Sequence, residues 1–201
     1  PGRLTHRDFC FVNKVAHVRS FFSLVAAAGR TIPRGQTRGE RWLRALDKPT
    51  GHVAWAADSV AWRLINIAAY APLVLASLDT DYRTGLLSHI ASCADYLDRF
   101  ADKARKGRPR AIAWIGVVAA GLLLPKGKAR QVNGEIALAR ALSDCVLADG
   151  GVASRAPLSL IEAIQALSLL KNCYAAVGQP CPAMITDRLA QIVPQLMTLS
   201  H

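Results

Sequence analysis

Aromatic residues are scarce in this chain and make up only 6% of its 201 residues. Because aromatic and β-branched side chains fill most β-strands, this scarcity argues against an all-β fold. Charged residues are also few, at 19%, whereas apolar residues reach 52%. A disordered chain has the opposite balance, so the composition predicts a folded domain with a substantial core.

The sequence also lacks an apolar run long enough for a transmembrane helix. The uncharged runs at residues 64–78 and 111–125 are shorter than the roughly 20 residues that a span requires. We therefore expect no membrane span and interpret both runs as buried helices. No signal peptide is visible, and since the sequence starts at Pro1, we expect the true N-terminus to lie upstream. The sequence consequently favours neither the periplasm nor the cytoplasm.

Metal-binding and redox patterns are missing as well. None of the five cysteines has Cys-x-x-Cys spacing, and no histidine follows at a zinc-finger interval. His89 and Cys93 are four residues apart, but two ligands do not make a metal site. Glycine-rich phosphate loops are also lacking. The sequence therefore predicts neither a metal nor a cofactor, and it favours buried, apolar roles for most cysteines.

What the chain has in excess is positive charge. The formal net charge is +11, from 25 Lys and Arg against 14 Asp and Glu. Residues 103–110 read KARKGRPR, and Lys126, Lys128 and Arg130 follow nearby. Such charge attracts nucleic acid, acidic polysaccharide or an anionic membrane, although it can also serve solubility alone. No helix-turn-helix or RNA-recognition signature accompanies it.

Hydrophobic periodicity predicts an all-α chain. The expected helices cover residues 7–29, 33–47, 60–78, 80–103, 111–124, 129–147, 157–177 and 183–199. Helices that are apolar on one side alternate with helices that are apolar all round. This alternation is typical of two concentric layers, as in an incomplete α/α toroid of about eight helices. A compact bundle around a central helix explains it equally well.

Two segments carry a family resemblance. Residues 55–66 read WAADSVAWRLIN and lead into Tyr-Ala-Pro-Leu at 70–73, while residues 149–157 read DGGVASRAP. Both resemble motifs of the bacterial heparinase II/III-like polysaccharide lyases, in the same order and on matching helices. The resemblance extends over roughly residues 10–200. It implies that residues 1–201 form a single helical toroid domain of a longer chain, whose C-terminal β-sandwich domain is missing here.

The resemblance implies β-elimination on a uronate-containing acidic glycan. That reaction needs a neutraliser for the substrate carboxylate and a base for the C5 proton. On this basis Asn66 and Tyr70 are the candidate catalytic residues. The candidate substrate-binding residues are Arg63, Asp149, Ser154 and Arg155.

Each candidate also has a structural interpretation. Asn66 can be a bonded amide within the helical core, Arg63 can pair with Asp58, and Tyr70 can be a core aromatic. Asp149 and Arg155 can brace their loop and cap the next helix.

The chain departs from the family pattern within the second motif. Val152 stands where the family has His, Ala156 replaces Asn, and the tyrosine that follows the loop in active lyases has no counterpart in 157–161. A lyase or an inactive relative therefore remains open. The alternative function is a non-catalytic basic helical module that binds nucleic acid or another polyanion.

Overall fold

The computed structural model describes residues 53–69 and 79–198. After the short 3-10 turn η1 (Val53–Trp55), these ranges contain the helices α4 (Ala57–Ala69), α6 (Thr80–Phe100), α7 (Arg108–Leu123), α8 (Lys128–Cys145), α9 (Pro157–Ala176) and α10 (Ala183–Thr198). A second 3-10 turn, η2 (Ala101–Lys103), follows α6. The described ranges contain no strand beyond an isolated antiparallel bridge between Val146 and Val152. The all-α prediction is thus confirmed for this part of the chain.

Two helices begin three residues earlier than the sequence predicts. The helix expected from residue 60 begins at Ala57, and the helix expected from residue 111 begins at Arg108. Helix α6 begins at residue 80 as expected and is capped by Asp79, whose carboxylate accepts hydrogen bonds from the backbone N–H groups of Asp81 and Tyr82, both at 3.0 Å. A short carboxylate reaches these free N–H groups well. The helices predicted at 7–29 and 33–47 lie outside the described residues.

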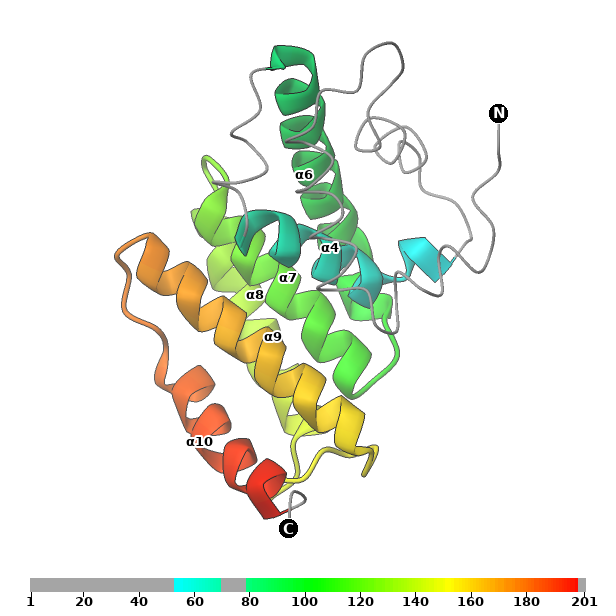
Figure 1. Cartoon of the computed structure of the whole chain (residues 1–201), viewed down its shortest axis with the longest axis vertical. Helices are drawn as coiled ribbons and strands as arrows, with labels where there is room; N and C mark the ends of the chain where they lie inside the picture. The colour runs from blue at the N-terminus through cyan, green and yellow to red at the C-terminus, as the bar shows by residue number, and fades with distance from the viewer. Residues whose placement is uncertain (1–52, 70–78, 199–201) are drawn as a thin grey trace.

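Helix α7 is the centre of the described structure (Figure 1). It packs against α4, α6, α8 and α9, and its middle is buried from Ala111 to Gly121 except for the half-buried Trp114. This explains why its sequence is apolar on every side. Within the described residues, α4, α6, α8 and α9 thus pack around one central helix.

Glycines let the neighbouring helices approach α7 closely. A Cβ added to Gly116 would lie 2.6 Å from the Ala61 Cβ on α4, and one added to Gly121 would lie 2.5 Å from the backbone nitrogen of Gln131 on α8. Atoms this close overlap, so only glycine permits these helix separations. The order of small residues in α7 therefore determines how near α4 and α8 can come.

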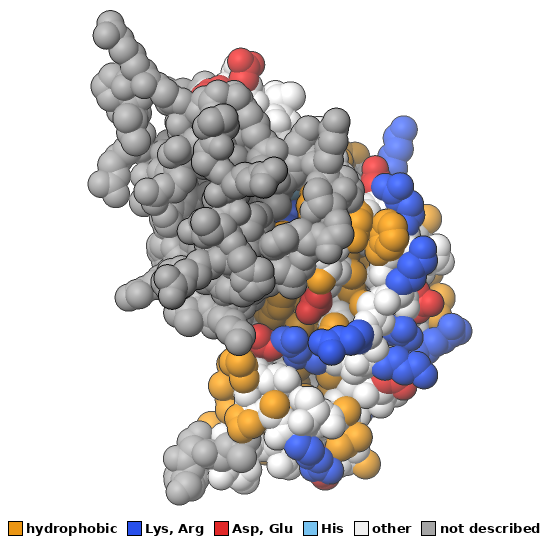
Figure 2. All heavy atoms as spheres, turned by 90° about the vertical axis from the view of Figure 1, so that its right-hand side faces the viewer, with side chains coloured by type: hydrophobic (Ala, Val, Ile, Leu, Met, Phe, Trp, Pro, Cys, Tyr) orange, Lys and Arg blue, Asp and Glu red, His pale blue; other side chains and the backbone are white. Residues whose placement is uncertain are grey.

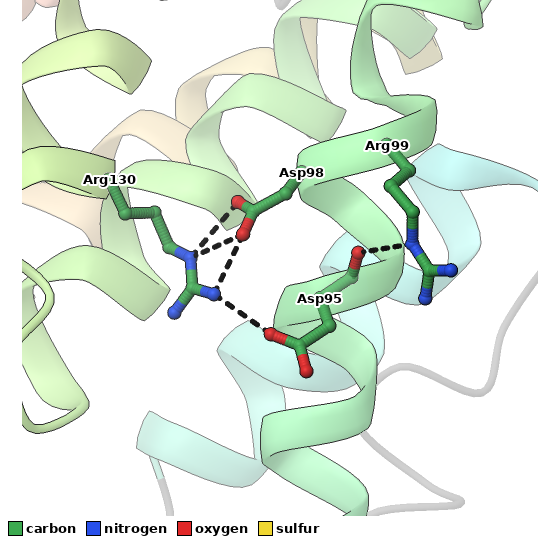
Figure 3. Close-up of polar contacts among 4 residues, drawn as sticks. All are labelled: Asp95, Asp98, Arg99 and Arg130. Carbon is green, nitrogen blue, oxygen red and sulfur yellow. Dashed lines mark hydrogen bonds and ion pairs between the residues drawn. The ribbon is translucent and has the colours of Figure 1, made fainter.

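An ion-pair network joins α6 to α8 (Figure 3). The Arg130 guanidinium donates to both Asp98 oxygens, at 2.7–3.0 Å, and to an Asp95 oxygen at 3.0 Å. Hydrogen bonds to Asp98 are the main cause that raises the pKa of Arg130. Arg130, which follows Lys126 and Lys128 in the sequence, is thus held by two acids.

We expect Gly116→Ala to lower the free energy of unfolding by about 1–3 kcal/mol, because the new methyl group overlaps Ala61 and forces α4 away from α7. Chemical denaturation followed by circular dichroism measures this change.

Gly134→Ala is the matched control, since it adds the same methyl group to a helix. Its Cβ would lie 3.0 Å and 3.1 Å from methyl groups of Val118 and Val117, which are side-chain atoms. The gain in helix propensity, up to about 1 kcal/mol, should offset most of this contact. Equal losses in the two variants would show that α4 and α7 do not pack as described.

Candidate functional site

The candidate residues on α4 are engaged with the protein itself. The Asn66 amide is buried and donates to the Trp62 carbonyl oxygen at 2.8 Å, one turn earlier. The Arg63 guanidinium donates to the Ala54 carbonyl oxygen at 2.5 Å and lies over the Trp55 ring, 5.1 Å from its centroid. Arg63 therefore fixes the turn that precedes α4. Tyr70 lies outside the described residues.

A buried polar cluster adjoins Arg63. Its guanidinium lies 4.0 Å from the Cys93 sulfur, and His89 Nε2 lies 3.4 Å from the same sulfur. Burial, together with the Arg63 charge, lowers the pKa of His89 to about 4. Burial also raises the pKa of the Cys93 thiol, more than the nearby Arg63 lowers it. Both groups are consequently neutral at pH 7, which suits a packed interior better than a reactive site.

Residues 149–157 include the loop between α8 and α9, which is held by hydrogen bonds among its own residues. The Asp149 carboxylate accepts hydrogen bonds from the Gly151 N–H at 2.8 Å and from the Arg155 guanidinium at 2.7 Å. These two donors, Gly151 first, lower the pKa of Asp149. Ser154 is exposed, and its Oγ lies 3.5 Å from the Ala156 nitrogen. Asp149 and Arg155 thus brace this loop as expected, but the expectation that they cap the next helix is wrong, because the N-cap of α9 is Ala156 and has no side-chain hydrogen bond.

Val152 packs the loop against the core of the described helices. Its side chain is only 4% exposed and belongs to the core, while its backbone forms the bridge with Val146. A valine satisfies that apolar position without a buried charge.

The clearest concentration of charge lies at the start of α7. The sequence from η2 into α7 carries five cations within eight residues, namely Lys103, Arg105, Lys106, Arg108 and Arg110. The Arg108 guanidinium pairs with Glu162 on α9 and lies 3.9 Å from the Asp58 carboxylate on α4. Within the part of the chain that the structure describes, Arg105 and Lys106 are exposed and make no ion pair.

A first hollow of about 390 Å³ opens on one side of this segment. Trp55, Tyr96 and Phe100 supply an aromatic wall, in which Tyr96 stacks on Phe100 with ring centroids 4.5 Å apart. Lys103 and Arg105 contribute positive charge, and the Lys103 ammonium lies 4.7 Å from the Phe100 centroid. The first turn of α4, from Ala57 to Ser59, completes the lining together with Ala56, Ala104 and Pro109. The wall thus combines ring faces with cations.

A second hollow of about 410 Å³ lies on the other side and shares Arg105 and Pro109 with the first. Its polar lining consists of Arg105, Lys106, Arg108, Ser154 and Ser159. Cys145 also lines it, but burial raises the pKa of this thiol to about 11. The thiol is thus protonated at neutral pH. We call the two hollows and the α6–α7 segment between them the basic face.

Three helices begin at the basic face. The first turns of α4 and α7 line the first hollow, and the first turns of α7 and α9 line the second. Neither α7 nor α9 has a side-chain hydrogen bond at its N-cap. Because each helix start carries a partial positive charge, all three add to the field of the cations. Figure 2, which views the side where the α6–α7 segment lies, shows Lys and Arg side chains spread across this face.

The two basic turns do not form one patch. The second turn, with Lys126 and Lys128, follows the opposite end of α7, about 24 Å away for a helix of 16 residues. Arg130 is neutralised there by Asp95 and Asp98.

The predicted site residues are likewise divided. Arg63 and Asn66 share α4, and Asp149 and Arg155 share a loop, but of the predicted residues that the structure describes only Ser154 lines a hollow of the basic face. The described residues contain no group of three potential metal ligands and no helix fit to span a membrane.

Comparisons of the chain with family models, with curated proteins and with solved structures gave no match.

Sequence reasoning found the cations of residues 103–110 but missed their surroundings. The four-residue spacing of Tyr96 and Phe100, just before the basic segment, was a usable signal for an aromatic wall. Nothing in the sequence indicated that the first turns of α4 and α9 lie beside it.

We expect His89 to make the domain less stable in mild acid. Above its ordinary pKa of 6.5 the side chain is neutral in both states. As the pH falls from 6.5 to about 4, the unfolded chain takes up a proton that the native state resists. The free energy of unfolding should therefore fall by roughly 3 kcal/mol across this window.

Urea denaturation at several pH values, with the wild type and His89→Leu compared, isolates this contribution from that of the carboxyl groups. The wild type should lose stability more steeply between pH 6.5 and 4. Parallel curves would contradict a buried, neutral His89.

Proposed function

We propose that this helical domain binds an acidic polymer at its basic face. The observation that carries the proposal is the pair of adjoining hollows, about 390 and 410 Å³, that share Arg105 and are lined by the cations of the α6–α7 segment. Three helix starts strengthen the positive potential in the same place. Two adjoining hollows lined with cations suit a chain of repeated negative charges.

An acidic polysaccharide is the first polymer that we propose, on the strength of the two motifs similar to the heparinase II/III-like lyases. The aromatic wall of the first hollow supports it, because ring faces pack against the apolar faces of sugars. In this proposal the described helices belong to an incomplete α/α toroid. A C-terminal β-sandwich would follow it in the longer chain.

Binding has more support in the described contacts than cleavage has. The Asn66 amide is bonded to its own helix, and Arg155 is bonded to Asp149. β-Elimination through Asn66 and Tyr70, with Arg63, Asp149, Ser154 and Arg155 as substrate contacts, remains a proposal. An ultraviolet absorbance assay that detects release of the unsaturated uronate product would establish this activity, provided that Asn66→Ala abolishes the release. A flat trace with binding intact would establish a binding domain without this activity.

Nucleic acid is the second candidate, and one observation favours it. Tyr96 and Phe100 are half-buried rings beside Lys103 and Arg105, and aromatic rings next to cations are also found where single strands are bound.

We expect the double substitution Arg105→Ala with Lys106→Ala to weaken polymer binding about tenfold. The slope of the logarithm of the binding constant against the logarithm of the salt concentration should become shallower by about one unit for each lost phosphate or carboxylate contact. The reason is that exposed Arg105 lines both hollows and exposed Lys106 lines the second. Fluorescence anisotropy with a labelled uronate oligosaccharide and a labelled single-stranded RNA, each at several salt concentrations, measures both effects and ranks the two polymers.

The matched control is the double substitution Arg83→Ala with Lys171→Ala. It removes the same charge from exposed positions on α6 and α9 that lie far along these helices from the basic face. Binding by this control should stay within about twofold of the wild type. Equal weakening by the two double variants would mean that net charge, and not the basic face, attracts the polymer.

A further inference from the structure

We infer that the second hollow binds the phosphate monoester group of a ligand, and that the adjoining first hollow receives the ring attached to it. This inference rests on the proposed function, because it assigns a particular anionic group to part of the same face. It is carried by the second hollow's donors, its charge and its position beside the aromatic wall.

The second hollow is lined by donors from three segments of the chain. Arg105, Lys106 and Arg108 come from the α6–α7 segment, Ser154 comes from the loop before α9, and Ser159 comes from the first turn of α9. Gly107 also lines the hollow, as the N-cap of α7 with a φ of 83°. Donors arranged around a space suit a tetrahedral group with three free oxygens, whereas a carboxylate offers only two oxygens in one plane.

The cations that line the second hollow favour a ligand group with two negative charges. Glu162 and Asp58 balance the Arg108 guanidinium, so its charge is already partly used within the protein. Arg105 and Lys106 are the two cations of the lining that make no ion pair among the described residues. A phosphate monoester carries close to two negative charges at neutral pH and therefore matches them, whereas a sulfate ester or a carboxylate carries one.

The neighbouring hollow indicates what the phosphate is attached to. The two hollows share Arg105 and Pro109, and the first hollow is also lined by the half-buried rings of Tyr96 and Phe100. A ligand with its phosphate in the second hollow can thus extend across Arg105 and place a ring beside these two side chains.

Three probes with the same ring test this inference: phenyl phosphate, phenyl sulfate and benzoate. Backbone amide shifts followed by NMR during titration of the full chain should identify Gly107, Ser154 and Ser159 as the responding residues. Phenyl phosphate should bind about tenfold more tightly than the other two, because of its extra charge. Its binding should weaken as the pH falls through about 6, where the phosphate gains a proton.

Ser154→Ala with Ser159→Ala removes two hydroxyl donors without changing the charge. The loss of these hydrogen bonds should weaken phenyl phosphate binding about fivefold or more, which corresponds to roughly 1 kcal/mol. Ser143→Ala, on the exposed side of α8, is the control and should leave binding unchanged.

Equal affinity for the three probes, or shifts confined to residues away from the second hollow, would overturn the inference. If phenyl phosphate does not bind the second hollow while the polymer still binds through Arg105 and Lys106, the inference is wrong and the proposed function stands. If phenyl phosphate binds the second hollow and no polymer binds, the proposed function is wrong and the phosphate site stands alone.

Discussion

The close approach of α4 and α8 to the central helix is the constraint on which the rest of the described structure depends. Gly116 and Gly121 leave room for the Ala61 methyl group and the Gln131 backbone, so both neighbours lie nearly in contact with the α7 backbone. At this separation dispersion contacts are numerous and side chains have little freedom to rearrange. The position of α4 beside α7 then determines where its first turn lies, and therefore the shape of the first hollow.

Charge is distributed unevenly over this framework. Acids on α6 hold Arg130 near the far end of α7, and Glu162 and Asp58 hold Arg108 at the near end. Arg105 and Lys106 lie in the segment between η2 and α7, where no acid is within ion-pair distance among the described residues. The overall charge of +11 is therefore less informative than the place where cations remain available.

The candidate residues within 55–66 and 149–157 have mainly structural contacts in the described chain. Arg63 holds the turn before α4, Asn66 bonds to its own helix, and Asp149 with Arg155 closes a loop. The same contacts can also position groups for a ligand, since a rigid loop and a fixed helix start are what a binding face requires. Ser154 links the two roles, because it belongs to the second motif and lines the second hollow.

Local patterns determined much of this protein from the sequence alone. The spacing of apolar residues gave five helices within a few residues of their observed ends, and Asp149, Gly150 and Gly151 marked the break before α9, because these signals act between near neighbours. The tertiary structure alone decided which helix is central and which first turns meet at the basic segment. Trp55, Tyr96 and Ser159 are far apart in sequence, and only packing through small residues on α7 brings their helices to one end of the molecule.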